Sequence, residues 1–484
     1  MEKNLKEKTF FNLLWRFAER ILAQGVTLLV TIVLARILMP EDYATVALVS
    51  VFVNICNIFV TQSFGNALIQ KKDADDLDFS TVFFINTAMT GIIYIAIFAF
   101  APLIANFYKM PILSPLLRVM ALRIPCAAIN SVQNAYVSRQ LKFKKYFFAT
   151  LTGTLVSAVV GISMALLGFG AWALVLQYLT NTFIDTVFLW FTVKWRPKLM
   201  FSFSRAGFLF SYGGKLLVSS LLEDASVEIK SAVIGKVYTS ADLAFYTKGK
   251  QFPQIINTNI NESISSVLFP VLSKAQDDVA LLKKYMSRVI KTSAFIIFPI
   301  QFGLIAVAPQ FVSAILSEKW MGCVPYLRIM CIAFLSTPIF TANQQIMKAM
   351  RKSGLVLAIS FIRSIGGIAL VFITLPLGVK AIAWSATAIS LAATIFSEIV
   401  TGKLINYGFF AQLKDLIPTV LLSLSMTAIV MLVGLLQLNQ FLVLILQVLV
   451  GAIFYIAVAR ITKMESYFYI FNFVKEKLKI GGKR

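Results

Sequence analysis

The sequence predicts an all-α, polytopic membrane protein. Of its 484 residues, 58% are hydrophobic and 14% are charged, whereas a soluble globular domain carries about 25% charged residues. Apolar stretches of the roughly 20 residues needed to cross a bilayer recur along the whole chain. At roughly 35 residues for a span with its turn, the chain has room for about 14 helices and for no large soluble domain.

Short polar breaks divide the chain into successive apolar segments, and segments seven and eight contain the most charges. The fourteen segments lie at residues 10–38, 43–66, 79–106, 113–137, 145–168, 170–194, 207–235, 241–272, 286–316, 323–350, 354–376, 379–403, 414–437 and 439–462. The first is too long for a cleaved signal peptide, so we expect it to be an uncleaved span.

The distribution of Lys and Arg predicts that both termini lie in the cytoplasm. Most of these residues fall in the tails and in the breaks on the N-terminal side, while the opposite side holds only Lys109, Lys236, Lys319 and Lys380. The net charge of +23 is therefore expected to face anionic membrane lipids, and no nucleic-acid partner is expected. The absence of histidine excludes His-based metal sites and proton relays.

An internal repeat predicts two similar lobes. Four groups of residues recur in the same order: Asp42, Ala44 and Leu68 as Asp242, Ala244 and Leu268; Ala101-Pro102 as Ala308-Pro309; Leu117-Arg118-Val119-Met120 as Leu327-Arg328-Ile329-Met330; and Gly168, Ala171 and Ala173 as Gly378, Ala381 and Ala383. Six spans separate the copies, so both copies have the same orientation, as in many transporters.

We therefore expect two parallel six-helix lobes, one in residues 1–200 and the other in residues 201–407. Two added spans follow in residues 408–462, and residues 463–484 are expected to form a basic interfacial tail. A charge present in both lobes is more often scaffold than substrate site, so the matched pair Arg118 and Arg328 is assigned to the scaffold.

The first span carries a cationic strip. Arg16, Arg20 and Gln24 repeat every four residues and therefore share one helical face, with Glu19 beside it. Guanidinium groups match phosphate oxygens, so this face is a candidate phosphate site. The alternative is an Arg16–Glu19 ion pair with Arg20 reaching the cytoplasmic surface.

Span seven carries acids on two adjacent faces. Lys215, Ser219 and Glu223 follow one i, i+4, i+8 row, and Ser220, Asp224 and Glu228 follow the next. We interpret Glu223, Asp224 and Glu228 as candidates for a coupling ion, Na+ or H+, with salt bridges to Lys215 and Lys230 as the alternative. Lys248 and Lys250 of span eight either complete a cationic cavity with Lys215 or neutralise these acids.

Charges within the spans favour an anionic cargo, because basic groups outnumber acidic ones there. No phosphate-binding loop, glycosyl-transfer carboxylate pair or nucleophile elbow is present, so we expect a transporter rather than an enzyme, without a cofactor. The short outward breaks disfavour a membrane polymerase or ligase, which needs a sizeable loop for its acceptor.

Several turns resemble those of a known transporter family. They are Ala35-Arg36-Ile37-Leu38-Met39-Pro40-Glu41-Asp42-Tyr43 after span one, Leu268-Phe269-Pro270 with Lys274 and Gln276-Asp277-Asp278 after span eight, and Glu318-Lys319-Trp320 after span nine. Together they resemble Wzx-type lipid-linked oligosaccharide flippases of the colanic-acid type. These form the polysaccharide transporter branch of the multidrug/oligosaccharidyl-lipid/polysaccharide exporter superfamily. Ala44 departs from the Gly that is common in relatives.

The resemblance implies a flippase of the bacterial inner membrane that acts by alternating access. Its cargo would be an undecaprenyl-pyrophosphate-linked oligosaccharide, moved to the periplasmic leaflet through a V-shaped cationic cavity, with the lipid tail in the bilayer at a side opening. Arg16 and Arg20 would line one lobe, and Lys248 and Lys250 the other. We expect a monomer that contacts the polysaccharide assembly machinery. A drug/cation antiporter of the same superfamily is the alternative.

Overall fold

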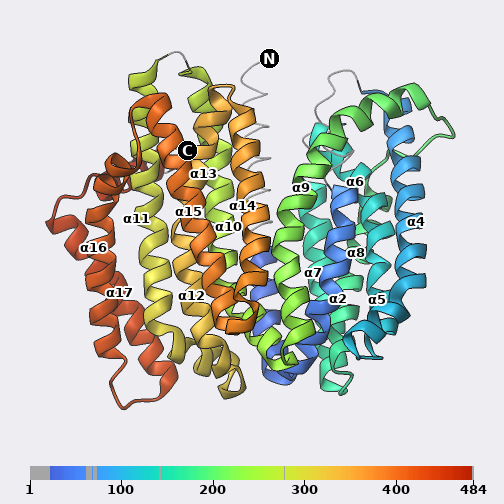
Figure 1. The fold of residues 1–484 in the computed structure, drawn as a ribbon, viewed down its shortest axis with the longest axis horizontal. Coiled ribbons are helices and arrows are strands. Elements are labelled where there is room, and N and C mark those ends of the chain that lie inside the picture. Colours follow the sequence, from blue (N-terminus) through green and yellow to red (C-terminus); the bar gives the residue numbers. More distant parts are fainter. Residues whose placement is uncertain (1–21, 62–67, 69–73, 141–142, 277, 482–484) are drawn as a thin grey trace. The chain divides into compact units, whose positions relative to one another are not determined.

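All regular elements in residues 22–61, 68, 74–140, 143–276 and 278–481, which the computed structural model describes, are helices (Figure 1). Eleven of the described helical segments are long and apolar enough to cross a membrane. The all-α, polytopic class is thus confirmed. The total of fourteen spans and the cytoplasmic location of both termini stay predictions.

The chain divides into two compact units, Met1–Ala244 and Phe245–Arg484. In the first, a helix at Leu22–Ile37 is followed by α2 (Pro40–Thr61), α4 (Asp76–Tyr108), α5 (Leu113–Ala121), α6 (Arg123–Arg139), α7 (Phe143–Leu166), α8 (Ala171–Thr192) and α9 (Phe203–Val237). The predicted lobe limits at residues 200 and 407 stay predictions.

Helix α10 (Ser240–Lys274) runs from the first unit into the second. The second unit continues with α11 (Val279–Phe311), η1 (Val312–Leu316), η2 (Glu318–Cys323), α12 (Val324–Leu335), α13 (Thr337–Ala349), α14 (Ser353–Thr374), η3 (Leu375–Leu377), α15 (Val379–Ile405), α16 (Phe409–Val433), α17 (Gln440–Ile461) and α18 (Glu465–Gly481).

Helices α9 and α10 are not among the eleven apolar spans, although each is 35 residues long. At about 1.5 Å per residue they are long enough to cross a bilayer. Charged residues of the two helices, among them Glu223 and Lys248, lower their hydropathy, and in α10 uncharged polar residues such as Asn257 lower it further. Charged side chains in a span must face protein or water, because hydrocarbon does not solvate them.

Repeated residues form the same turns at both copies of the repeat. Asp42 Oδ2 accepts a hydrogen bond from the Met39 amide at 3.0 Å, and Asp242 Oδ2 accepts one from the Thr239 amide at 3.3 Å. The matching glycines that precede α8 and α15 both have positive φ, +80° at Gly168 and +98° at Gly378. The sequence repeat therefore corresponds to repeated local structure.

Arg205, at the start of α9, binds the acidic N-terminus of α4 within the first unit. Asp75 and Asp78 form a capping box there, in which the side chain of each accepts a bond from the other's amide, at 3.0 and 3.2 Å. Arg205 Nη1 lies 2.5 Å from Asp75 Oδ1 and 3.0 Å from Asp78 Oδ2, and Asp78 is fully buried. The end of α4 is thereby fixed to the start of α9.

An aromatic core lies next to this ion pair. Phe79 and Trp195 are buried, with ring centroids 5.6 Å apart, and Tyr136 packs against both. The Trp195 indole donates a hydrogen bond to Asp76 Oδ1 at 3.2 Å. The segment between α8 and α9 is therefore held to α4 by both apolar and polar contacts.

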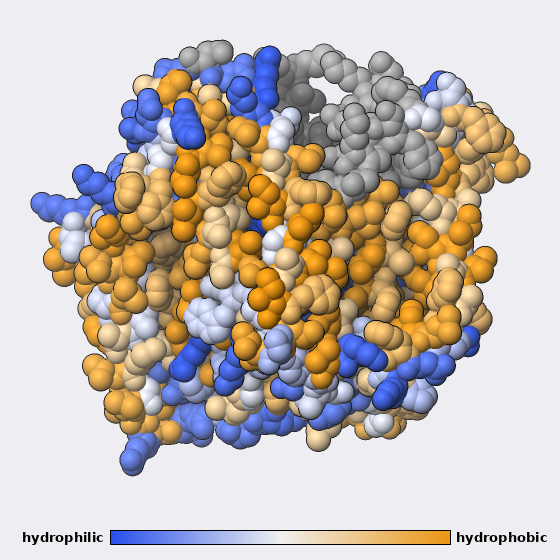
Figure 2. Space-filling model, in the orientation of Figure 1, coloured by the Kyte–Doolittle hydropathy of each residue, from blue (hydrophilic) through white to orange (hydrophobic). Residues whose placement is uncertain are grey.

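The surface of the helices is apolar along their middle lengths. On the face in Figure 2, hydrophobic residues cover the central parts of the helices and hydrophilic residues gather towards their ends. In α4, for example, Ile92, Ile95 and Leu103 are each more than 60% exposed. Large exposed side chains of this kind suit contact with lipid rather than water.

We expect Arg205→Met to lower the free energy of unfolding by about 1–3 kcal/mol, because the buried Asp78 loses its cation. Lys198→Met is the matched control: Lys198 pairs with Asp76 at 2.6 Å, but both side chains are about half exposed. Its loss should cost no more than about 0.5 kcal/mol. Thermal unfolding of the two purified variants measures both losses of stability. Equal losses would contradict the stabilising role given to the contact between Arg205 and the buried Asp78.

The stabilisation by Arg205 should also depend on pH. The hydrogen bond from Arg205 lowers the pKa of Asp75 to about 2, from an ordinary value of about 3.9. Since the folded state favours the ionised carboxylate, this contribution is complete above about pH 4 and is lost as the pH falls towards 2. The stability difference between the wild type and Arg205→Met should narrow over that range.

Candidate functional site

The predicted cationic strip of the first span is described only in part. Arg16 and Arg20 lie outside the described residues. Gln24 lies on the helix at Leu22–Ile37 and is exposed. The role of this strip in binding phosphate therefore stays a prediction.

The predicted acids of span seven lie on α9, which is fastened to the first unit. Asn54 of α2 donates a hydrogen bond to Glu228 Oε1 at 3.1 Å, and the Tyr108 hydroxyl of α4 donates to the Ala232 carbonyl at 3.3 Å. Lys236 donates to the Phe107 carbonyl. Glu228 is half-buried and acts as an anchor between α9 and α2.

Glu223 and Asp224 differ from Glu228 because both are exposed. Neither forms an ion pair with another described residue. Lys215 also lies on α9. Adjacent exposed carboxylates on a membrane helix are suited to attract a cation, although no described group of three acidic, Cys or His residues forms a metal cluster.

Lys248 of α10 lies inside the second unit. It is 2% exposed, and its Nζ lies 5.2 Å from the centroid of the fully buried Trp320 ring, as in a cation–π contact. Close packing surrounds it: a Cβ on the neighbouring Gly249 would lie 2.7 Å from Tyr326 Cβ. Lys250, two residues later, is half-buried. The predicted role of Lys248 and Lys250 in lining a cationic cavity stays a prediction.

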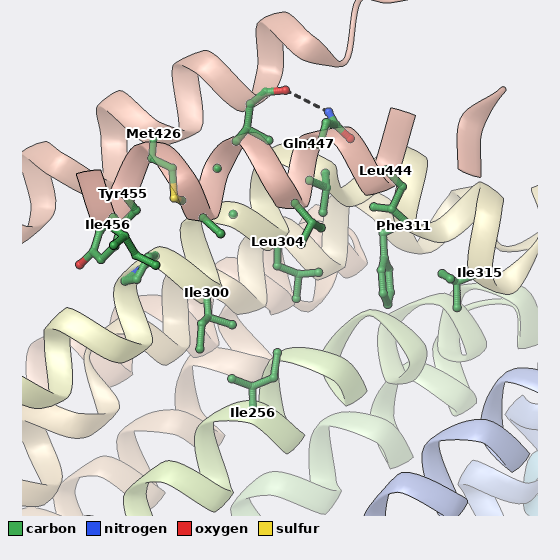
Figure 3. A pocket seen from close by; sticks show the side chains of 17 residues that line it. Ile256, Ile300, Leu304, Phe311, Ile315, Met426, Leu444, Gln447, Tyr455 and Ile456 are labelled. Carbon is green, nitrogen blue, oxygen red and sulfur yellow. Dashed lines mark hydrogen bonds between the residues drawn. The ribbon is translucent and has the colours of Figure 1, made fainter. Parts of the chain in front are cut away.

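An open apolar pocket of about 580 Å³ lies among α10, α11, α16 and α17 of the second unit. Figure 3 shows Ile256 of α10 on one side, Ile300 and Leu304 of α11 along the middle, and Leu444 and Tyr455 of α17 on the other side. Its size is within the range of small-molecule sites, about 300–1,000 Å³. We call this pocket the apolar groove.

Tyr455 joins α17 to α11 near Pro299, beside this groove. Pro299 has no amide hydrogen, so the carbonyl four residues before it, that of Phe295, lacks its helical donor. The Tyr455 hydroxyl donates to this carbonyl at 2.9 Å, and its ring lies 5.0 Å from the Phe295 ring. The added helix α17 therefore supplies a hydrogen bond that α11 cannot make.

A polar network in the second unit was missed by sequence reasoning. Asn343 of α13 and Gln412 of α16 exchange two amide hydrogen bonds, at 2.9 and 3.0 Å. Beside them, Asp415 Oδ2 accepts bonds from Ser287 and Tyr407 at 2.6 and 2.7 Å. Burial raises the pKa of Tyr407, which keeps its hydroxyl protonated as the donor. The Asn–Gln pair had no periodic signal in the sequence.

The comparisons with known proteins agree on one class. Residues 33–325 match the model of the family described as "Polysaccharide biosynthesis protein". The chain is 24% identical to the lipopolysaccharide biosynthesis protein WzxC of Escherichia coli (strain K12), over 69% of this chain and 68% of that protein. It is 26% identical to the teichuronic acid biosynthesis protein TuaB of Bacillus subtilis (strain 168), over 62% of each.

A solved structure shares the fold. The inward closed conformation of lipid II flippase MurJ superposes with a TM-score of 0.74, at 18% identity, over 94% of this chain and 98% of that one. At this identity the likeness concerns the fold alone. It agrees with the all-helical membrane architecture described above.

We expect Glu228→Leu to lower the free energy of unfolding by about 0.5–1.5 kcal/mol, because the acceptor for Asn54 is lost. Glu228→Gln keeps an acceptor oxygen and should stay within about 0.5 kcal/mol of the wild type. Glu223→Leu is the matched control at an exposed position. Thermal unfolding measures all three, and equal effects of the two leucine variants would exclude the anchoring role.

Proposed function

The chain belongs to the polysaccharide biosynthesis protein family, and from this premise we propose that it is a lipid-linked oligosaccharide flippase. It moves undecaprenyl-pyrophosphate-linked repeat units from the cytoplasmic to the periplasmic leaflet of the bacterial inner membrane by alternating access. Such a cargo has a long hydrocarbon tail and an anionic, hydroxyl-rich head. Moving the head through hydrocarbon without a protein would cost tens of kcal/mol, because its charges and hydroxyls would lose water.

The observation that carries the proposal is the apolar groove of the second unit, on a chain whose α9 and α10 carry charged residues. Its described lining is almost entirely hydrocarbon, from Ile256 of α10 to Ile456 of α17. A surface of this kind suits the polyprenyl tail, while the charges of the first span and of α9 and α10 suit the head. One protein thus presents both chemistries that an amphipathic cargo requires.

The head would be held by the cationic residues. Arg16 and Arg20 would receive the pyrophosphate, with Gln24 as a neutral donor and Lys215, Lys248 and Lys250 as further cations. An inside-negative membrane potential favours outward movement of the anion by about 2.3 kcal/mol per charge per 100 mV. Import of Na+ or H+ at Glu223 and Asp224 would add to this drive or reset the carrier.

The tail helix α18 would hold the protein at the inner leaflet. Its Phe468, Tyr469 and Phe471 are 40–50% exposed, and Lys475 follows on the same helix. Aromatic rings at the headgroup level with lysines towards anionic lipid are typical of interfacial helices. In this proposal the flippase works as a monomer beside the polysaccharide assembly machinery.

A deletion strain with intact sugar-assembly enzymes tests the function. We expect completed lipid-linked repeat units to accumulate and surface polymer to be lost, with both restored by the wild-type gene. The Arg16→Ala/Arg20→Ala variant should accumulate as protein but fail to restore export, because the head loses its phosphate donors. Normal levels of the lipid-linked units in the deletion strain would overturn the proposal, and drug susceptibility would then be measured. Full export by the double variant would exclude the cationic strip as the site that binds the pyrophosphate.

Filling the apolar groove should impair export without unfolding the protein. A Cβ on Gly303 would meet Met426 Cε at 3.6 Å, an ordinary contact, so Gly303→Leu fills the groove without backbone strain. Displacing two methylene groups of a bound tail removes about 1.6 kcal/mol, roughly a tenfold loss of affinity.

Gly91→Leu on α4 is the matched control, because a Cβ there meets no atom within 4 Å and Gly91 does not line the groove. Export of lipid-linked units and protein level are measured for both variants. Equal export by the two leucine variants would exclude the groove as the tail site.

A further inference from the structure

Two prolines at matching positions of the repeat interrupt the backbone hydrogen bonding of long helices. Pro102 lies inside α4, and Pro309 lies inside α11. Proline has no amide hydrogen, so the carbonyl four residues before it has no helical donor. The carbonyls concerned are those of Phe98 and Ile305. Within a bilayer no water is available to replace the missing donor.

Each of these two carbonyls receives a hydrogen bond from an arginine. Arg118 Nε of α5 donates to the Phe98 carbonyl at 3.2 Å, and Arg328 Nε of α12 donates to the Ile305 carbonyl at 3.1 Å. The Arg118 guanidinium also lies 4.2 Å from the Phe98 ring centroid. Both arginines are half-buried. The same geometry therefore occurs once in each unit.

The match is more specific than general contact between neighbouring helices. In each unit, the arginine binds the one carbonyl that the proline leaves without a donor, and it does so through the same atom, Nε. The prolines and the arginines belong to two of the sequence groups that recur between the lobes. The Tyr455 hydroxyl donates to a third such carbonyl, that of Phe295 in α11. Different side chains can therefore replace a lost backbone donor, but only the arginine bond occurs at matching positions of the repeat.

We propose that Arg118 and Arg328 are positioning residues that replace the backbone donors lost at Pro102 and Pro309. A hydrogen bond from a charged donor is about twice as strong as a neutral one, so it restores continuity across the interruption. The segment of α4 beyond Pro102 then moves with α5, and that of α11 beyond Pro309 moves with α12. The consequence for transport rests on the proposed function: the arginine–carbonyl bond keeps each long helix rigid while the carrier changes conformation.

A double-mutant cycle tests the pairing in the full-length purified protein. Pro102→Ala restores the amide that donates to Phe98, so Arg118 should no longer be needed. We expect Arg118→Met alone to lower the midpoint of thermal unfolding by about 3–6 °C. Introduced into the Pro102→Ala protein, the same change should lower it by no more than about 1 °C. Equal losses in the two backgrounds would overturn the proposal, as an anion-binding role for Arg118 would predict.

Mispaired variants provide the control. Arg118→Met with Pro309→Ala should lose as much as Arg118→Met alone, because the restored amide lies in the other unit. Arg328→Met should behave in the mirrored way, with rescue by Pro309→Ala and none by Pro102→Ala. Rescue by either proline change without regard to pairing would also overturn the proposal, since it would indicate general stabilisation.

The cycle remains decisive if Arg118→Met alone does not accumulate. Accumulation of Arg118→Met/Pro102→Ala would then itself be the expected rescue, and failure of both would contradict the pairing. Thermal unfolding without cargo does not depend on the proposed function. Export of lipid-linked units by the rescued variant is measured separately, and loss of export there with normal stability would show that Arg118 acts on the cargo rather than on Phe98.

Discussion

The structure depends on one constraint: a backbone carbonyl or amide in hydrocarbon must find its partner within the protein. Helices meet this demand internally, which explains why the described elements are helical. At three prolines, Pro102, Pro299 and Pro309, a side chain of a neighbouring helix supplies the lost donor: Arg118, Tyr455 and Arg328 respectively. The proline positions of α4 and α11 are therefore also points at which helices are joined.

The same constraint governs the side chains. Some polar groups inside the units are paired across helices, by the contacts of Arg205 in the first unit and by Asn343 with Gln412 in the second. The carboxylates of Glu223 and Asp224 on α9 are exposed instead, and an exposed charge on a helix within a membrane is costly unless water or a ligand meets it. Stability thus favours polar residues that are paired inside the protein, whereas transport requires polar residues that are free to meet a cargo or an ion.

Composition and periodicity were sufficient to predict the helical membrane class, because hydropathy reports directly on transfer into lipid. The repeat predicted two similar lobes, and at its matching positions Gly168 and Gly378 share a positive φ. The apolar groove could not be predicted, since an apolar residue facing a groove and one facing lipid look alike in sequence. The contact between Lys248 and Trp320 could not be predicted either. The charge of Lys248 suggested that it lines an open cavity, whereas the burial of Lys248 depends on which segment packs against α10.

The paired proline and arginine have an evolutionary consequence. A proline at position 102 or 309 leaves a deficit that only a donor on the next helix corrects, whereas the arginine without the proline is a charge in the membrane with no carbonyl to serve. If the proposed pairing holds, neither residue is advantageous alone, so we expect the two positions to change together. Duplication of an ancestral lobe would have copied this dependence together with the helices, and each half would then keep or lose both residues together.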